Sequence, residues 1–271
     1  MKSGRIVTIL LWCYAAFVFA FIFAPIVVSF IVSFNSDRFP TLPLGEFTTK
    51  WYEDIWGDPT LWPALQRTVI VGVCTALIST LLGFGAAYTD YRYRFFGKNF
   101  YLALALLPPT IPVVILGLAM LVFLSQVGLF GQLHSVILSH VVLCTPFAMA
   151  LVRLRLSQMD ESLEAAAWNL GASEWRAMRE VILPFTLPSI LSALFITMAV
   201  SFDEFAIAFF VSGFAETLPV RILAMFQGQV SPRINAIGSI VFTVTMALVI
   251  LAQVALIVRN PARAKLAGAD A

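Results

Sequence analysis

Two adjacent carboxylates inside a long apolar run are the residues of this sequence best suited to chemistry at membrane depth. Asp203 and Glu204 lie in AVSFDEFAIAFF, a run without a basic residue that could neutralise them. A central Asp costs about 2.5–3.5 kcal/mol on membrane-insertion scales, so an intramembrane carboxylate usually serves a function. Neighbouring helical positions point about 100° apart, so both side chains cannot face one narrow pore. The alternative is a structural carboxylate bonded to another helix or to the outer interface.

A second group of candidate residues lies in the polar stretch 160–184, DESLEAAAWNLGASEWRAMREVILP. Its pattern predicts two short amphipathic helices. Asp160 is placed to cap the first helix, and Gly171 stands where a helix end requires positive φ. Ser173 is placed to cap the second helix, and Pro184 is expected to stop it and to open a new apolar run.

Each predicted helix of this stretch has one apolar side. The spacing i, i+3, i+4, i+7 places on one face of the first helix Leu163, Ala166, Ala167 and Leu170. One side of the second helix carries Trp175, Met178, Val181 and Ile182, whereas Glu174, Arg176, Arg179 and Glu180 are available to water. Such helices between membrane spans indicate either a dock for a partner outside the membrane or a loop lying on the lipid headgroups.

The histidines, the cysteines and the Gly97-Lys98 pair form no recognisable catalytic, metal or phosphate-binding site. His134 and His140 are six positions apart and fall on different helix faces, so we expect no metal pair. The three cysteines lie in apolar runs and are interpreted as small hydrophobic residues. Gly97-Lys98 is followed by Asn99 and lacks the upstream glycine of a phosphate-binding loop. We therefore expect no catalytic residue, no metal, no ATP binding and no enzyme activity in this chain.

The composition places these candidates in a membrane protein. Hydrophobic residues make up 60% of the 271 residues, charged residues make up 12%, and the mean hydropathy is +0.92. Soluble chains carry about 25% charged residues. The net charge of +2 and the lack of a basic run with interleaved aromatics argue against nucleic acid as a partner.

Six apolar runs are long enough to cross a bilayer, which takes about 20 residues. We therefore predict an all-α integral membrane protein with spans at about 6–34, 65–88, 100–124, 133–152, 185–214 and 236–258. The first run is too long for a signal-peptide core and is interpreted as a retained helix, kinked near Pro25.

Small residues and prolines predict how these spans pack. Gly72 with Ala76, and Ser79 with Gly83 and Ala87, follow the four-residue spacing that lets helices approach closely in lipid. The third run must be broken or kinked near its three prolines, at positions 108, 109 and 112. This break indicates either a water-filled translocation path or a simple packing kink.

Basic residues predict the orientation of the spans. Twelve of the 17 Lys and Arg residues lie on one side: Lys2, Arg5, Arg92, Arg94, Lys98, Arg153, Arg155, Arg176, Arg179, Arg259, Arg263 and Lys265. The other side has Arg38, Lys50, Arg67, Arg221 and Arg233. By the positive-inside rule, both termini and the polar stretch are cytoplasmic.

Several motifs resemble binding-protein-dependent ABC importer permeases. They are Glu164-Ala165-Ala166-Ala167, Leu170-Gly171-Ala172-Ser173, Val181-Ile182-Leu183-Pro184, Pro108-Pro109-Thr110-Ile111-Pro112, His140-Val141-Val142 with Pro146-Phe147, and Ser201-Phe202-Asp203-Glu204-Phe205 through Val211-Ser212-Gly213. Residues 218–222 and 230–236 look most like the second permease of spermidine/putrescine importers.

The resemblance implies one transmembrane domain over residues 1–271, of the type I ABC importer fold. The polar stretch, about 155–184, would be the cytoplasmic loop between the fourth and fifth helices that docks on a separate ATPase. Its matching positions are Glu164, Ala165, Ala166, Ala167, Leu170, Gly171, Ala172, Ser173, Leu183 and Pro184. The family pattern places its glutamate six residues before the glycine, where this chain has Ala165. Glu164 is therefore displaced by one position.

The resemblance also implies the partners. They are a sister permease, two cytoplasmic ATPase subunits that bind ATP and Mg²⁺, and a periplasmic substrate-binding protein, all at a bacterial inner membrane. A polyamine cargo such as putrescine or spermidine suits the sequence, because a cation gains from a fixed carboxylate such as Asp203 or Glu204. Phe202 and Phe205 could add cation–π contacts.

Three alternatives remain open at this point. The same kind of permease could carry another cargo, such as ferric ion, a phosphonate or an amino-acid derivative. A secondary transporter driven by an ion gradient would leave the docking loop unexplained, and no inverted repeat is visible. A membrane scaffold or sensor would leave the intramembrane carboxylates without purpose.

Overall fold

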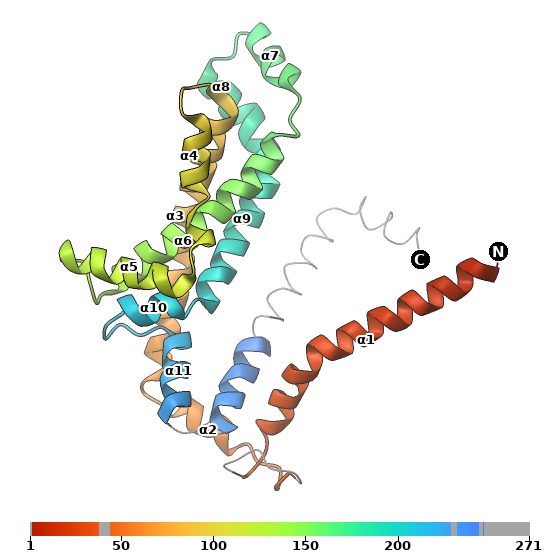
Figure 1. Ribbon diagram of the computed structural model, residues 1–271, viewed down its shortest axis with the longest axis vertical. Helices are drawn as coiled ribbons and strands as arrows, with labels where there is room; N and C mark the ends of the chain where they lie inside the picture. The colour runs from red at the N-terminus through yellow and green to blue at the C-terminus, as the bar shows by residue number, and fades with distance from the viewer. Residues whose placement is uncertain (1, 38–43, 229–231, 244–245, 247–271) are drawn as a thin grey trace. The chain divides into compact units, whose positions relative to one another are not determined.

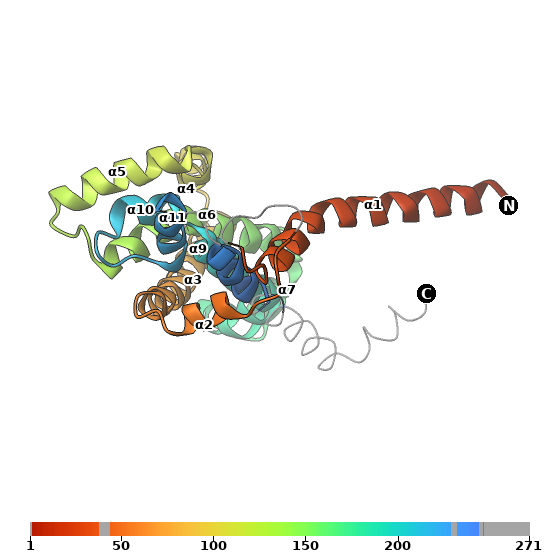
Figure 2. The same ribbon diagram turned by 90° about the horizontal axis from the view of Figure 1, so that it is seen from below.

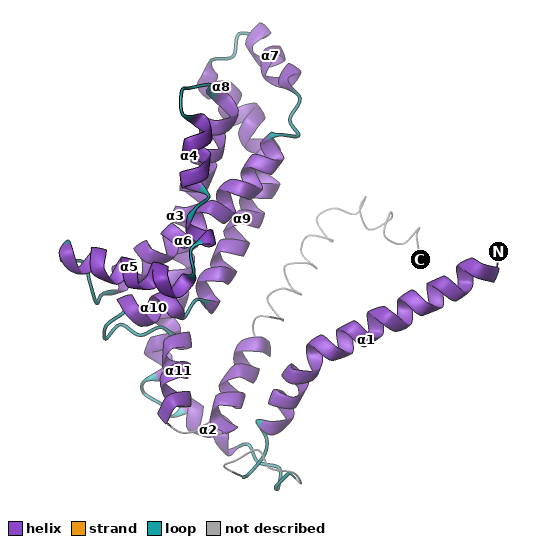
Figure 3. Cartoon of the chain, viewed as in Figure 1, coloured by secondary structure: helices purple, strands orange, loops and turns teal. Residues whose placement is uncertain are grey.

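The computed structural model describes residues 2–37, 44–228, 232–243 and 246, and their regular structure is helical (Figures 1 and 3). The helices are α1 (Lys2–Val32), α2 (Lys50–Trp56), α3 (Leu61–Arg92), α4 (Lys98–Ala105), η1 (Pro108–Thr110), α5 (Val113–Gln126), α6 (Leu133–Leu156), α7 (Glu161–Asn169), α8 (Glu174–Ala177), η2 (Met178–Ile182), α9 (Leu183–Asp203), α10 (Ala206–Val211) and α11 (Leu218–Gly228). Residues 232–243 are also helical. The chain forms two compact units, one from Pro59–Leu223 and the other from the segments on either side.

Four helical stretches are long and apolar enough to cross a membrane: Arg5–Val32, Leu61–Arg92, Leu133–Leu156 and Glu174–Asp203. They correspond to the first, second, fourth and fifth predicted spans. The sixth predicted span is described only in part, and its end lies outside the described residues. Arg38, Arg259, Arg263 and Lys265, which entered the orientation argument, also lie outside them.

The unit Pro59–Leu223 is built around α3, α6 and α9, which pack against one another. Small residues permit this packing, as predicted. A Cβ at Gly83 would lie 2.6 Å from the Ala148 Cβ and 2.7 Å from the Met149 nitrogen, and a Cβ at Gly72 would collide with the Phe202 ring. Figure 1 shows α7 and α8 at one end of these three helices and α5 and α10 toward the other. Figure 2 shows α5 and α10 side by side, in agreement with their contact.

The third apolar run is interrupted, as its prolines predict. It forms α4, the single turn η1 at Pro108–Thr110, and then α5, whose N-cap is Pro112. With 14 residues, α5 is shorter than the roughly 20 residues that cross a bilayer.

The second helix of the polar stretch does not stop at Pro184, so that expectation is wrong. α8, η2 and α9 instead form one continuous helical stretch, Glu174–Asp203. The π-turn η2 directly precedes the proline, and the Leu183 N–H donates to the Met178 carbonyl within it. Such local π adjustments let a membrane helix accommodate the proline's missing N–H and its clash with the preceding turn.

The fifth apolar run also differs from the expected single span. α9 ends at Asp203, the backbone is extended at Glu204, and α10 begins at Ala206. Asp203 and Glu204 therefore do not lie in the middle of one helix, as the sequence predicts. They lie at a break between two helices.

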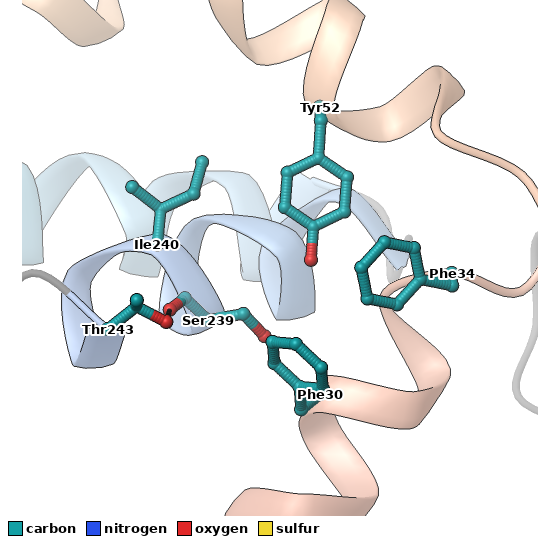
Figure 4. Close-up of a pocket in the computed structure, with 6 residues that line it drawn as sticks. All are labelled: Phe30, Phe34, Tyr52, Ser239, Ile240 and Thr243. Atoms are coloured by element: carbon teal, nitrogen blue, oxygen red, sulfur yellow. Dashed lines mark hydrogen bonds between the residues drawn. The ribbon is translucent and has the colours of Figure 1, made fainter.

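The other unit contains α1, α2 and residues 232–243. An isolated bridge joins Asn35 and Phe47, and the Trp51 Nε1–H donates to the Asn35 carbonyl over 2.7 Å. A pocket of about 260 Å³ in this unit is lined by Phe30, Phe34, Tyr52, Ser239, Ile240 and Thr243 (Figure 4).

Candidate functional site

Three local features that shape the polar loop are confirmed. An Asp160 carboxylate oxygen accepts the Ser162 N–H over 2.9 Å, and this backbone hydrogen bond lowers the pKa of Asp160 from its ordinary value. Gly171 has φ of +80°, and its N–H donates to the Trp168 carbonyl over 2.8 Å. The Ser173 hydroxyl accepts the Arg176 N–H over 3.3 Å. These contacts close α7 at both ends and start α8.

The apolar face predicted for α7 points away from the rest of the chain. Leu163 is 44% exposed and Leu170 is 89% exposed, whereas Glu164 on the adjacent face is only 5% exposed. Apolar surface of this kind on a membrane protein's polar loop is typical of an interaction site. Ala165 and Ala166 are exposed, and Ala167 and Ala172 are half-buried.

α8 and η2 are anchored more firmly. Met178 and Val181 pack against a buried cluster that contains Ile182 and residues of α3 and α6. Of the predicted apolar side, Met178, Val181 and Ile182 pack within this chain. Trp175 is instead 74% exposed at the start of α8. Trp175 therefore belongs with Leu163 and Leu170, and we call these three residues the exposed apolar set of the loop.

Arg92, the last residue of α3, contacts the loop at three points. Its guanidinium lies 3.7 Å from a Glu164 oxygen, donates to Glu174 over 3.2 Å, and lies 4.8 Å from the Trp168 ring centre. In the sequence, Arg92 stands out only as one of the basic residues that indicate orientation. No local pattern pairs it with Glu164, because the two residues are far apart in the chain.

A second ionic cluster lies where α3 ends. Asp90 is buried, accepts the Arg153 Nε–H over 2.6 Å, and lies 3.2 Å from the Lys98 ammonium. Because these residues belong to α3, α6 and α4, the cluster ties one end of each of these three helices together.

The four candidate pathway residues at the end of α9 have different environments. Asp203 is exposed and makes no hydrogen bond or ion pair within the described part of the chain. A Glu204 oxygen accepts the Ile207 N–H over 2.9 Å and so caps α10. Phe202 is half-buried and occupies the space beside Gly72, whereas Phe205 is exposed. Asp203 and Phe205 are thus the more exposed two of these four residues.

The two histidines also differ in exposure. His140 is fully buried, and its Nδ1 shares a hydrogen bond of 2.8 Å with the Ser201 hydroxyl, whereas His134 is exposed. Among the described residues, no group of three or more His, Cys, Asp and Glu side chains is placed to hold a metal ion.

Comparison with known proteins gives a consistent result. The family model described as "Binding-protein-dependent transport system inner membrane component" matches residues 79–263. The spermidine/putrescine transport system permease protein PotC of Escherichia coli is 33% identical over 237 residues, with 87% of this chain and 89% of that protein covered. The putrescine transport system permease protein PotI of Escherichia coli is 32% identical, with 82% of each chain covered.

The name of a further relative gives a different cargo. The molybdate/tungstate transport system permease protein WtpB of Thermococcus kodakarensis is 32% identical over 170 residues, with 63% of this chain and 68% of that protein covered. A bacterial ABC transporter involved in alginate import has the same fold, with a TM-score of 0.70 at 16% identity over 94% of this chain and 97% of that chain. A second structure of an alginate transporter, in complex with a periplasmic protein, has a TM-score of 0.69 at 16% identity, with 92% of each chain covered.

Proposed function

Because this chain belongs to the family of binding-protein-dependent transport system inner membrane components, we propose that it forms part of the translocation pathway of an ATP-driven polyamine importer. It is a multi-pass membrane permease of the ABC importer type and not itself an enzyme. The proposal assigns its cargo, its docking surface and its partners.

The observation that carries the proposal is the exposed apolar set on a loop with capped helices. Leu163, Leu170 and Trp175 are exposed, and α7 and α8 lie at one end of the packed helices α3, α6 and α9 (Figure 1). An ATPase groove that received these side chains would remove them from water, and each large side chain contributes about 1.5–3 kcal/mol when fully buried. ATP-driven movement of the ATPase would then move α9 directly, because α8, η2 and α9 are continuous. Such coupling requires the dock to differ between two states of the complex.

ATP and Mg²⁺ would be bound by two such ATPase subunits and not by this chain. The remaining partners of the proposal are a sister permease and a periplasmic substrate-binding protein. Residues 1–271 would form one permease domain in a bacterial inner membrane. This domain would have six spans and both termini in the cytoplasm. Arg92 at the end of α3, Arg153 and Arg155 in the last turn of α6, and Arg176 and Arg179 of the loop support this orientation.

A polyamine is the cargo that fits Asp203. Asp203 and Phe205 are both exposed and lie two positions apart in the chain, where α9 ends and α10 begins. A carboxylate and an aromatic face both attract an ammonium group. An oxyanion such as the cargo named for WtpB would instead be repelled by this carboxylate. Of the four candidate pathway residues, we therefore assign cargo contact to Asp203 and Phe205. Glu204 and Phe202 support the local backbone and packing.

The docking proposal is tested with the purified complex of both permeases and the ATPase. Gly171→Val forces a β-branched residue into positive φ at the turn between α7 and α8, so we expect ATPase to be lost from the complex during affinity purification. Gly128→Val is the matched control, because Gly128 also has positive φ with open space around it but follows α5. Equal ATPase retention in wild type and Gly171→Val would contradict the proposal.

A further inference from the structure

The contacts of Arg92 carry an inference about how the docking loop is held. Arg92 ends α3, which packs against α6 and α9, so its backbone belongs to the most closely packed part of the unit. α7, by contrast, packs only against α8 and η2 among its stronger element contacts. The interactions between Arg92 and the loop therefore join a sparsely packed helix to a well-packed one.

Glu164 is buried against this arginine. Its side chain is 6% exposed, one oxygen lies 3.7 Å from the guanidinium, and the other oxygen is buried without a hydrogen bond. A buried carboxylate is costly unless a charge compensates it, and Arg92 is the basic residue in ion-pair contact with it. Glu164 is thus committed to a contact inside this chain and is not presented to a partner.

The same arginine sets the rotation of α7. Glu164 and Trp168 are four positions apart and share one helix face, and Arg92 contacts both. Leu163 and Leu170 are seven positions apart and share a neighbouring face, which this rotation leaves exposed. A planar guanidinium suits this role, since it can pair with carboxylates and stack on an indole at once.

We propose that Arg92 is the positioning residue of the docking loop, which it holds through Glu164, Glu174 and Trp168 so that Leu163 and Leu170 face outward. In this arrangement Glu164 acts inside the permease rather than as a contact for the ATPase. The consequence for ATPase retention rests on the proposed function, whereas the ordering of α7 does not.

The test measures two quantities on the full complex in detergent. Hydrogen–deuterium exchange of the peptide covering residues 161–170 reports the ordering of α7, and the ATPase retained after dilution reports docking. We expect R92Q and E164Q each to speed exchange in this peptide and to lower retention, by roughly two- to tenfold, in the range of coupled neighbouring residues. The double variant R92Q/E164Q should exchange no faster than R92Q alone, because both changes remove the same contact.

R94Q is the matched control. Arg94 is exposed and lies two residues beyond Arg92, and R94Q removes the same charge as R92Q. Exchange of residues 161–170 and ATPase retention should therefore both stay at the wild-type value. Unchanged exchange of residues 161–170 in R92Q would overturn the proposal. A second result would also overturn it: E164Q lowers ATPase retention without changing the exchange of residues 161–170, and this loss of retention adds to that of R92Q. Glu164 would then be a contact of the ATPase.

The two proposals fail in different ways. A wild-type complex that retains no ATPase at all would contradict the proposed docking function. The exchange of residues 161–170 would still decide the role of Arg92, since it is measured within this chain.

Discussion

At the scale of single residues, the structure separates two acidic neighbours that the sequence presents as a pair. Glu204 uses its carboxylate to accept the Ile207 N–H, and Asp203 leaves its carboxylate exposed at the end of α9. The helix break between α9 and α10 produces this difference. Glu204 therefore supports the backbone, whereas the Asp203 carboxylate is accessible to another molecule.

Asp203→Asn is expected to lower the kcat/KM of putrescine uptake by roughly 10- to 150-fold, because a contact with a charged group contributes about 1.5–3 kcal/mol. The measurement is initial uptake rate against putrescine concentration in vesicles that contain the intact complex. Glu204→Gln is the comparison, since the amide oxygen of Gln can still accept the Ile207 N–H. We expect it to reduce uptake less than Asp203→Asn does. Wild-type kinetics in Asp203→Asn would contradict the assigned cargo contact.

At the scale of elements, α3 and α6 approach so closely at Gly83 that no side chain fits between them. A Cβ there would lie 2.6 Å from the Ala148 Cβ, whereas a Cβ at Gly85 would meet nothing within 4 Å. The two glycines lie on the same helix, so their backbone cost is similar and their surroundings differ.

Gly83→Ala is therefore expected to destabilise the unit by about 1–3 kcal/mol, the usual cost of overpacking a core. Gly85→Ala should be neutral or stabilise by up to about 1 kcal/mol, since alanine favours a helix over glycine. Thermal unfolding of the purified complex in detergent compares the two variants. A lower Tm for Gly85→Ala than for Gly83→Ala would show that close packing at Gly83 is not what holds the helices together.

Element-level features were predictable wherever the determining contact is local. Asp160, Gly171 and Ser173 act on backbone groups within three residues, so their types and positions alone predict the turns that they form. The prediction that the helix stops at Pro184 was wrong, because the proline alone does not show whether a preceding π-turn lets the helix continue. The break after Asp203 was missed for a related reason: apolar residues continue on both sides of it, and no proline or glycine marks it.

At the scale of the whole molecule, the sequence predicted the class of protein but not the long-range contacts that organise the loop. Hydropathy identifies four spans that the structure also has, since it depends only on composition along the chain. The pairing of Arg92 with Glu164 depends on how α3 lies beside the loop, which no local pattern encodes. For the same reason, the sequence indicated an apolar face on α7 without showing that this face is exposed.

In the proposed mechanism, this permease carries a cationic polyamine past Asp203, driven by an ATPase held at the α7–α8 loop. The most direct measurement is ATP-dependent uptake into vesicles that contain this chain with its sister permease, the ATPase and the binding protein. Labelled putrescine and spermidine are compared with labelled molybdate. We expect ATP-dependent uptake of at least one polyamine and no uptake of molybdate. ATP-dependent uptake of molybdate with none of either polyamine would contradict this mechanism.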